Sequence, residues 1–226
     1  TYDYSLSNGE AVLAAYERVQ IRSPSPRQEH MLTARREINL LFVEMSNKQV
    51  NLWKVEPLSI DLVESTATYD VPARVVMILD AYVSLDNGTS DQTDRYITPI
   101  SRTDYASQSA KFIEAPPPTY WFDRLIAPEV TFYPVPDGGG PYVFNYYACV
   151  QMQDANLAGG ETPDLPYRWL DVMVAGLAYR LARVYAPPLV AALKQDYADA
   201  WAAAATQDTE NVPLVIAPNL SAYYRR

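Results

Sequence analysis

The sequence has only one cysteine, Cys149, and one histidine, His30, among its 226 residues. A single cysteine excludes an intrachain disulfide framework and a metal site built from four thiolates. Cys149 stands in an apolar, strand-like stretch, so we expect a small packed residue there and not a reactive thiol. We expect His30 to lie on a helix surface or to be partly buried, with a Cys149–His30 catalytic pair as the weaker alternative.

Long apolar runs are also missing. No run reaches the roughly 18 residues that a membrane span requires. The longest candidate, residues 170–185, is interrupted by Asp171, Arg180 and Arg183. The N-terminal residues show no basic region followed by an apolar segment, so we expect no secretory signal and no membrane partner.

Sequence motifs that carry chemistry are absent as well. No nucleophile elbow, HExxH pair, phosphate-binding loop or dinucleotide fingerprint occurs. The glycines at 138–140 lead toward a strand and not a helix, and the acidic loop at 86–94 lacks the spacing of an EF-hand. We therefore expect no catalytic residue, no cofactor and no metal site. A carboxylate-based hydrolase of cell-wall sugars stays open as an alternative, because a catalytic carboxylate pair has no sequence signature of its own.

The composition favours assembly. The chain carries 27 acidic and 18 basic residues, a formal charge of −9. This charge argues against a protein that binds the phosphates of nucleic acid through a net positive charge. An acidic surface can still surround DNA loosely, because repulsion keeps a passing duplex from sticking. The 18 tyrosines suit surfaces buried against partners, and the 18 prolines suit extended arms and loops.

Helical periodicity predicts two helices at the start of the chain and two near its end. A capping box formed by Ser7 and Glu10 opens the first helix, and Asp164 is the expected N-cap of the third. Pro187 and Pro188 end the third helix. An alanine-rich end, 202–205, would let another helix approach the fourth closely. The expected apolar stripes contain Val12, Leu13, Tyr16 and Val19; Met31, Ala34, Ile38, Leu41, Phe42 and Met45; Trp169, Leu170, Met173, Val174, Leu177, Leu181 and Val184; and Leu189, Val190, Leu193, Tyr197 and Trp201.

Between these helices the pattern changes to short runs rich in β-branched and aromatic residues, which predict strands. Turn residues at 86–88 and 136–141 predict hairpin connections, and a short helix is expected at 103–109 with Thr103 as its cap. The expected strands lie at 58–63, 74–85, 95–100, 120–125, 129–135 and 142–151.

The fold class is therefore α+β, with an antiparallel bundle of about four helices, an inserted antiparallel β module and an extended C-terminal arm. Residues 1–51 and 160–205 would form the bundle core, 52–159 the inserted module and 206–226 the arm. The arm is apolar and rich in proline, so we expect it to dock on a partner; the alternative is that it folds back on its own domain. The candidate docking residues are Val212, Leu214, Val215, Ile216, Tyr223 and Tyr224.

An ordered series of six segments runs through the stretch 97–185, roughly 40% of the chain. The segments are PISRTDY at 99–105, PPTYWFD at 117–123, VTFYPVP at 130–136, VFNYY at 143–147, LPYRWLD at 165–171 and GLAYRLA at 176–182. In this order they resemble the adaptor, or head-to-tail connector, proteins of tailed bacteriophages, especially the short-tailed type.

This resemblance implies a non-enzymatic virion protein at the head–tail junction, assembled in the host cytoplasm. It implies a homo-oligomeric ring of about twelve subunits between the portal protein and a downstream tail or nozzle protein, with double-stranded DNA passing without sequence-specific contacts. In such families the C-terminal segment often reaches the portal. Arg35, Arg36, Arg180 and Arg183 are candidates for facing the channel or a neighbouring subunit. The principal alternative is a receptor- or carbohydrate-binding β module of another tail component.

Overall fold

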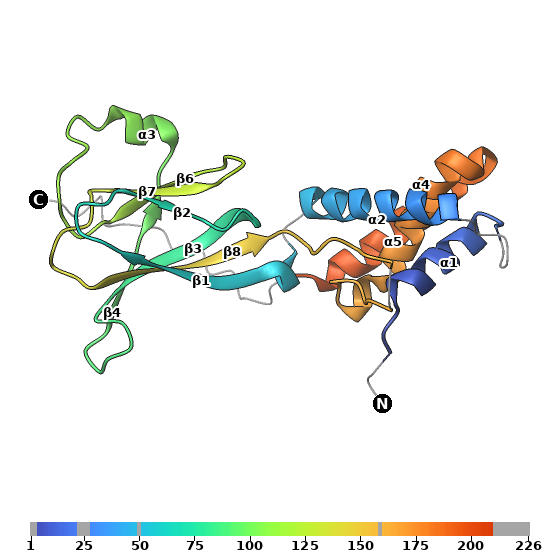
Figure 1. Cartoon of the computed structure of the whole chain (residues 1–226), viewed down its shortest axis with the longest axis horizontal. Helices are drawn as coiled ribbons and strands as arrows, with labels where there is room; N and C mark the ends of the chain where they lie inside the picture. The colour runs from blue at the N-terminus through green and yellow to red at the C-terminus, as the bar shows by residue number, and fades with distance from the viewer. Residues whose placement is uncertain (1–3, 22–27, 49–50, 158–159, 210–226) are drawn as a thin grey trace, which may run out of the picture.

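A computed structural model describes residues 4–21, 28–48, 51–157 and 160–209. The molecule is elongated, with the strands at one end and the long helices at the other (Figure 1). Each end has its own cluster of buried apolar residues, so the chain builds two separate hydrophobic cores. The sequence also predicts Ser25 as the N-cap of the second helix with Pro26 at its first position. Both residues, and the six candidate docking residues of the arm, lie outside the described residues.

Five α-helices occur in the described part of the chain, and four of them are longer than ten residues. The predicted capping box at Ser7 is confirmed: its hydroxyl accepts from the backbone N–H of Glu10, whose carboxylate accepts from the backbone N–H of Ser7. The helices are α1 (Asn8–Arg18), α2 (Gln28–Lys48), the short α3 (Arg102–Ser107), α4 (Leu170–Tyr185) and α5 (Val190–Gln207).

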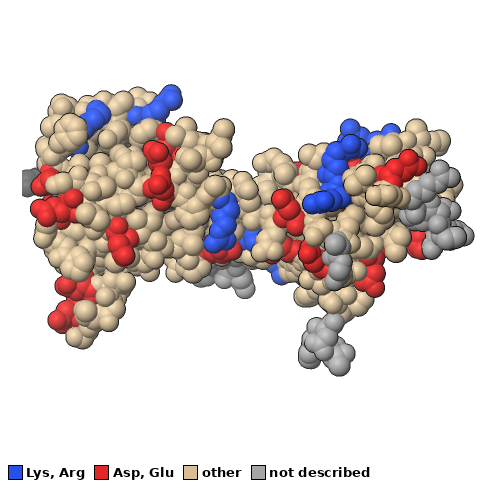
Figure 2. Space-filling model, in the orientation of Figure 1, with Lys and Arg blue, Asp and Glu red and all other residues tan. Residues whose placement is uncertain are grey.

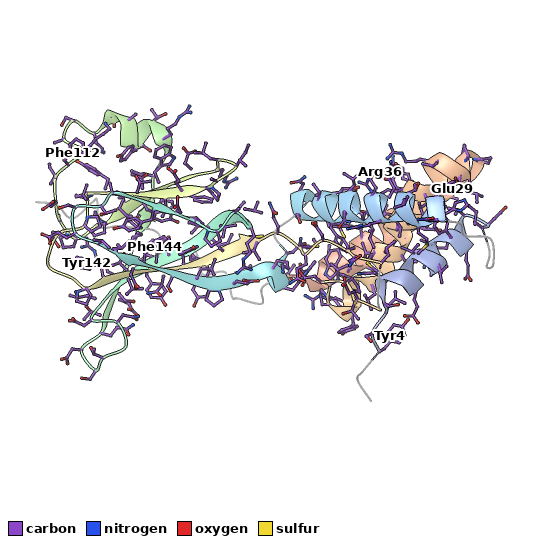
Figure 3. The ribbon with its side chains drawn as sticks, viewed as in Figure 1. Tyr4, Glu29, Arg36, Phe112, Tyr142 and Phe144 are labelled. Atoms are coloured by element: carbon purple, nitrogen blue, oxygen red, sulfur yellow. The ribbon has the colours of Figure 1, made fainter. Side chains whose placement is uncertain are left out.

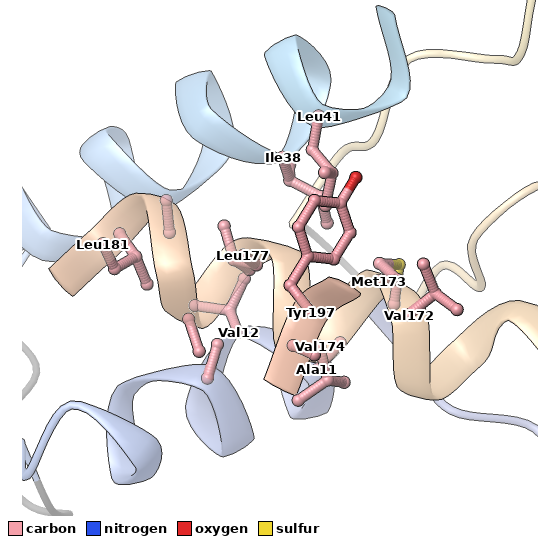
Figure 4. Packing of buried hydrophobic residues seen from close by; sticks show 14 of the residues in the cluster. Ala11, Val12, Ile38, Leu41, Val172, Met173, Val174, Leu177, Leu181 and Tyr197 are labelled. Carbon is pink, nitrogen blue, oxygen red and sulfur yellow. The ribbon is translucent and has the colours of Figure 1, made fainter. Parts of the chain in front are cut away.

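Helix α4 is the centre of the helical region, since α1, α2 and α5 all pack against it. Ten of its 16 residues are buried, which matches its nearly continuous apolar sequence. The side chains of Leu41 of α2 and Tyr197 of α5 pack closely against the backbone of α4 at Gly176. Figure 4 shows these two side chains in the core. The predicted apolar stripes of α2 and α4 are confirmed, except that Val184, at the end of α4, is 54% exposed.

The strands form two four-stranded sheets. The first has the order β1-β8-β3-β4 and is antiparallel; the second has the order β2-β7-β6-β5, in which β5 runs parallel to β6. The strand bounds are β1 Val55–Leu62, β2 Thr68–Asp70, β3 Val75–Leu85, β4 Thr93–Tyr96, β5 Thr98–Pro99, β6 Thr119–Asp123, β7 Glu129–Tyr133 and β8 Tyr142–Val150.

The two sheets pack face to face through aromatic side chains. Along β8, Phe144, Tyr146 and Ala148 are buried while Tyr147 between them is exposed, the alternation expected of a strand with one covered face. Phe144 meets Phe132 of the other sheet with ring centroids 4.9 Å apart (Figure 3 labels Phe144). This edge-to-face contact closes the core of the strand-rich end.

Three local predictions were wrong. Asp164 does not cap α4, because a 3-10 turn at Tyr167–Trp169 precedes that helix. The Asp164 carboxylate instead accepts a hydrogen bond from Lys54 Nζ at 2.7 Å. Residues 136–141 join strands of different sheets, so they are no hairpin, whereas the turn after β3 does lead to its neighbour β4. The short helix α3 is capped by Ser101 and not by Thr103.

The two ends of the molecule meet at a cluster of tryptophans. Trp53, in the 3-10 turn Leu52–Lys54 before β1, packs on Trp169, which in turn packs on Trp201 of α5, both at 4.9 Å between ring centroids. The ion pair of the nearly buried Lys54 with Asp164 lies at the same junction. Residues far apart in the sequence thus fix how the strands continue into the helices.

Substitution of Gly176 tests the close packing around α4. A Cβ atom there would lie 2.8 Å from Leu41 Cδ1 and 2.9 Å from Tyr197 Cε2. We expect Gly176→Val to lower the free energy of unfolding by about 3 kcal/mol through overpacking, measured by urea denaturation. Gly9→Val in α1, where a Cβ would meet nothing within 4 Å, is the matched control and should change it by less than about 1 kcal/mol. Equal losses in both variants would contradict this account.

Candidate assembly surfaces

Arg180 of α4 forms hydrogen bonds and ion pairs with α2, which we call the Arg180 clamp. Its guanidinium donates to Glu44 Oε2 at 2.6 Å and to the backbone carbonyl of Leu40 at 3.3 Å, and it pairs with Glu37 at 3.5 Å. The side chain is only 13% exposed. Of the four arginines predicted to face a channel or a neighbour, Arg180 therefore pairs within its own chain, where it holds α4 against α2.

A second polar contact ties α2 to α5. Lys48 Nζ donates to the hydroxyl of Tyr197 at 3.0 Å, lies 2.9 Å from Glu44 Oε1 and sits over the rings of Tyr197 and Trp201. Burial alone would raise the pKa of Glu44, but hydrogen bonds from Lys48 and Arg180 outweigh it and leave that pKa below its usual value. Likewise, burial would lower the pKa of Lys48, but its bonds to Tyr197 and Glu44 raise it. Both groups therefore stay charged at neutral pH.

Three of the predicted arginines, Arg35, Arg36 and Arg183, are exposed. Figure 2 shows basic side chains gathered over the part of the molecule where α2 lies. Arg36 makes one long contact, 3.4 Å, to the neighbouring Glu37. These side chains are accessible to a partner, unlike that of Arg180.

The outer face of α2 is also apolar, which the sequence analysis missed. Leu32, Leu40 and Val43 are 63%, 47% and 57% exposed and lie at helical spacing around Arg36. The signal was present in the sequence as apolar residues on the side of the helix opposite the core stripe. We call these four residues the α2 stripe; its apolar members span about 16 Å along the helix.

A groove of about 700 Å³ lies between α1, α4 and the segment before α1. Ala14 of α1 with Leu170 and Val174 of α4 give it an apolar lining. Two largely exposed tyrosines, Tyr4 and Tyr167, also line it, as does the surface ion pair Arg18–Asp171 at 2.8 Å. We call this the α1–α4 groove; no pattern in the sequence pointed to it, because its residues come from three separate segments.

The strand-rich end exposes apolar and aromatic side chains of its own. Phe112, in the loop before β6, is 90% exposed, and Ile126, in the β6–β7 turn, is 99% exposed. Trp121 of β6 stacks on Tyr105 of α3 at 5.4 Å between ring centroids. Phe112 and Ile126 are therefore accessible from solvent at this end of the molecule.

The residues considered for catalysis lie apart. His30 packs between the rings of Tyr16 and Tyr185 in the helical region, whereas Cys149 lies in β8, where burial raises the pKa of its thiol. In the part of the chain that the structure describes, no group of three or more His, Cys, Asp or Glu side chains is placed to hold a metal ion. No helix among the described residues is long and apolar enough to cross a membrane.

The described residues thus form a helical region and a strand-rich region, each with exposed apolar side chains. The sequence profile of a family described as SU10 adaptor protein matches residues 28–217. The chain therefore belongs to this family of phage head-to-tail adaptors, and the predicted resemblance is confirmed over a longer stretch than 97–185. The family is structural, which implies a non-enzymatic protein. No curated protein sequence matches the chain.

The Arg180 clamp can be tested by removing its charge. We expect Arg180→Met to lower the free energy of unfolding by about 3 kcal/mol, because Glu37 and Glu44 would keep their largely buried charges with fewer partners. Arg183→Met, one turn away on the same helix but exposed, is the control and should stay within about 0.5 kcal/mol of wild type in urea denaturation. Similar losses in the two variants would show that the clamp contributes little.

Proposed function

We propose that the chain is the repeating subunit of a ring between the portal and the tail of a bacteriophage, with a channel through which double-stranded DNA leaves the head. The observation that carries this proposal is the family match over residues 28–217, which includes α2 to α5 and all eight strands. The task is geometric, since a ring needs one contact that repeats between identical subunits.

We further propose a division of labour between the bundle core (1–51 and 160–205), the inserted module (52–159) and the arm (206–226). The helical core would line or brace the channel, and Arg35, Arg36 and Arg183 would face the channel or a neighbouring subunit. The whole chain has a net charge of −9, and the proposed core carries 11 acidic and 10 basic residues, so the wall of the channel would have no positive excess to hold the duplex. The exposed Phe112 and Ile126 support a contact between the strand-rich end and the downstream tail protein.

Ring formation is measured directly by native mass spectrometry and negative-stain microscopy of the protein alone and mixed with the portal of its phage. We expect closed rings of one size, either free or on the portal, because a head-to-tail contact with a fixed angle closes at one copy number. A monomer that ignores the portal would overturn the proposal.

The arm would reach the portal through Val212, Leu214, Val215, Ile216, Tyr223 and Tyr224. Because α5 runs to Gln207 and the buried Asp208 pairs with Arg168 at 2.8 Å, a deletion should begin at residue 210 to spare both. We expect deletion of 210–226 to weaken portal binding about tenfold or more with an unchanged melting temperature. The paired substitution Val215→Asp and Ile216→Asp should act in the same way. If both variants bind the portal as tightly as the wild-type protein, the arm does not dock there.

The stacked and half-buried pair of Tyr105 and Trp121 supports one alternative, a carbohydrate- or receptor-binding module, in which a sugar would stack on the accessible part of these rings. Binding of host glycans that quenches tryptophan fluorescence and is lost in Trp121→Ala would favour it. The family match favours the adaptor.

A further inference from the structure

We propose that the ring contact is formed by the α2 stripe of one subunit packing into the α1–α4 groove of the next, with Arg36 beside Asp171 of its neighbour. This inference depends on the proposed ring and names the two surfaces that build it. The occupant of the groove is thus a second copy of this chain.

The two surfaces differ, as a ring requires. A two-fold contact joins a surface to itself, whereas a cyclic ring of more than two subunits joins two unlike surfaces head to tail. Here one surface is the α2 stripe, which we also call the ridge because its side chains project from the helix, and the other is the α1–α4 groove. In Figure 3, Arg36 of the ridge and Tyr4 of the groove lie on opposite edges of the helical region. Each subunit can therefore contact one neighbour with each edge.

The charges of the two surfaces are complementary. The ridge carries Arg36 with Arg35 nearby, both exposed. On the groove side, Asp171 is 71% exposed despite its pair with Arg18, and α1 also exposes Glu10 and Glu17. Arg18 and Asp171, the two charged residues that line the groove, balance each other, and the exposed carboxylates of α1 leave this edge with a net negative charge. A positive α2 stripe beside this edge favours the head-to-tail pairing over a pairing of two like surfaces.

The side chains in the groove also suit an incoming arginine. Tyr4 and Tyr167 offer exposed rings on which a guanidinium can stack, and the Asp171 carboxylate can accept its hydrogen bonds. Arginine and tyrosine are enriched in protein interfaces, and the apolar neighbours of Arg36 would exclude water from that contact. The apolar lining formed by Ala14, Leu170 and Val174 would receive the leucines of the ridge.

A charge exchange tests this pairing, with assembly on the portal read out by native mass spectrometry and negative-stain microscopy. We expect R36E alone and D171R alone each to reduce ring formation about tenfold or more at equal concentration, because each places like charges together. The R36E/D171R double variant should restore rings. An equal mixture of the two single variants should also form rings, with the two kinds alternating, because each kind supplies the surface that the other has lost.

Matched controls separate this contact from general effects of charge and hydrophobicity. Lys194→Glu changes an exposed charge on α5, and Val63→Ser removes an exposed apolar side chain at the strand-rich end; both should leave ring formation unchanged. Leu40→Ser and Tyr167→Ser, one on each surface, should weaken it without changing the melting temperature.

The outcomes distinguish this contact from the function it rests on. If the wild-type protein forms rings and the R36E, D171R, Leu40→Ser and Tyr167→Ser variants form them equally well, the proposed pairing is wrong and the adaptor function is unaffected. The same persistence is expected if the chain's own 17 residues 210–226 fill the groove, so that occupant also counts against the proposal. A wild-type protein that forms no ring and ignores the portal would overturn the function and the pairing together.

Discussion

The packing of three helices on α4 is the constraint on which the helical region depends. Ten of the 16 residues of α4 are buried, and the backbone at Gly176 is approached by both Leu41 and Tyr197. Close-packed interiors tolerate little change in volume, so α1, α2 and α5 have one arrangement around it. The positions of the exposed faces of α1 and α2 follow from that arrangement.

The polar contacts reinforce the same geometry at its edges. Arg180 joins α4 to α2, and Lys48 joins α2 to α5, so α2 is held to both of these helices by charged hydrogen bonds. Next to Lys48, the Trp53–Trp169–Trp201 cluster and the Lys54–Asp164 pair lie where the chain passes between the helices and the strands. A movement of the strand-rich end would have to break these contacts with the helical core.

The sequence predicted the elements well and their partners poorly, for physical reasons. The Ser7 cap and the α2 core stripe were predictable because both are set by residues within a few turns of each other. Asp164 was misassigned because its partner Lys54 lies 110 positions away, and 136–141 because turn residues do not say which strands they join. The sequence identified four arginines as candidates for contact. Only the structure shows that Arg180 pairs with acidic residues of its own chain, whereas Arg36 is exposed. The α1–α4 groove had no local signal at all.

The requirements of a ring explain why such a rigid core would suit an adaptor. A head-to-tail contact fixes only how two neighbours meet; whether the chain of contacts closes depends on the angle between the two contact surfaces of a single subunit. If these surfaces are the α2 stripe and the α1–α4 groove, that angle is set by how α1 and α2 sit on α4. A small shift in this packing, repeated at every subunit, would open the ring into a helical filament. Tight packing at Gly176 and the charge clamp at Arg180 would then matter for closure more than for the strength of any one contact.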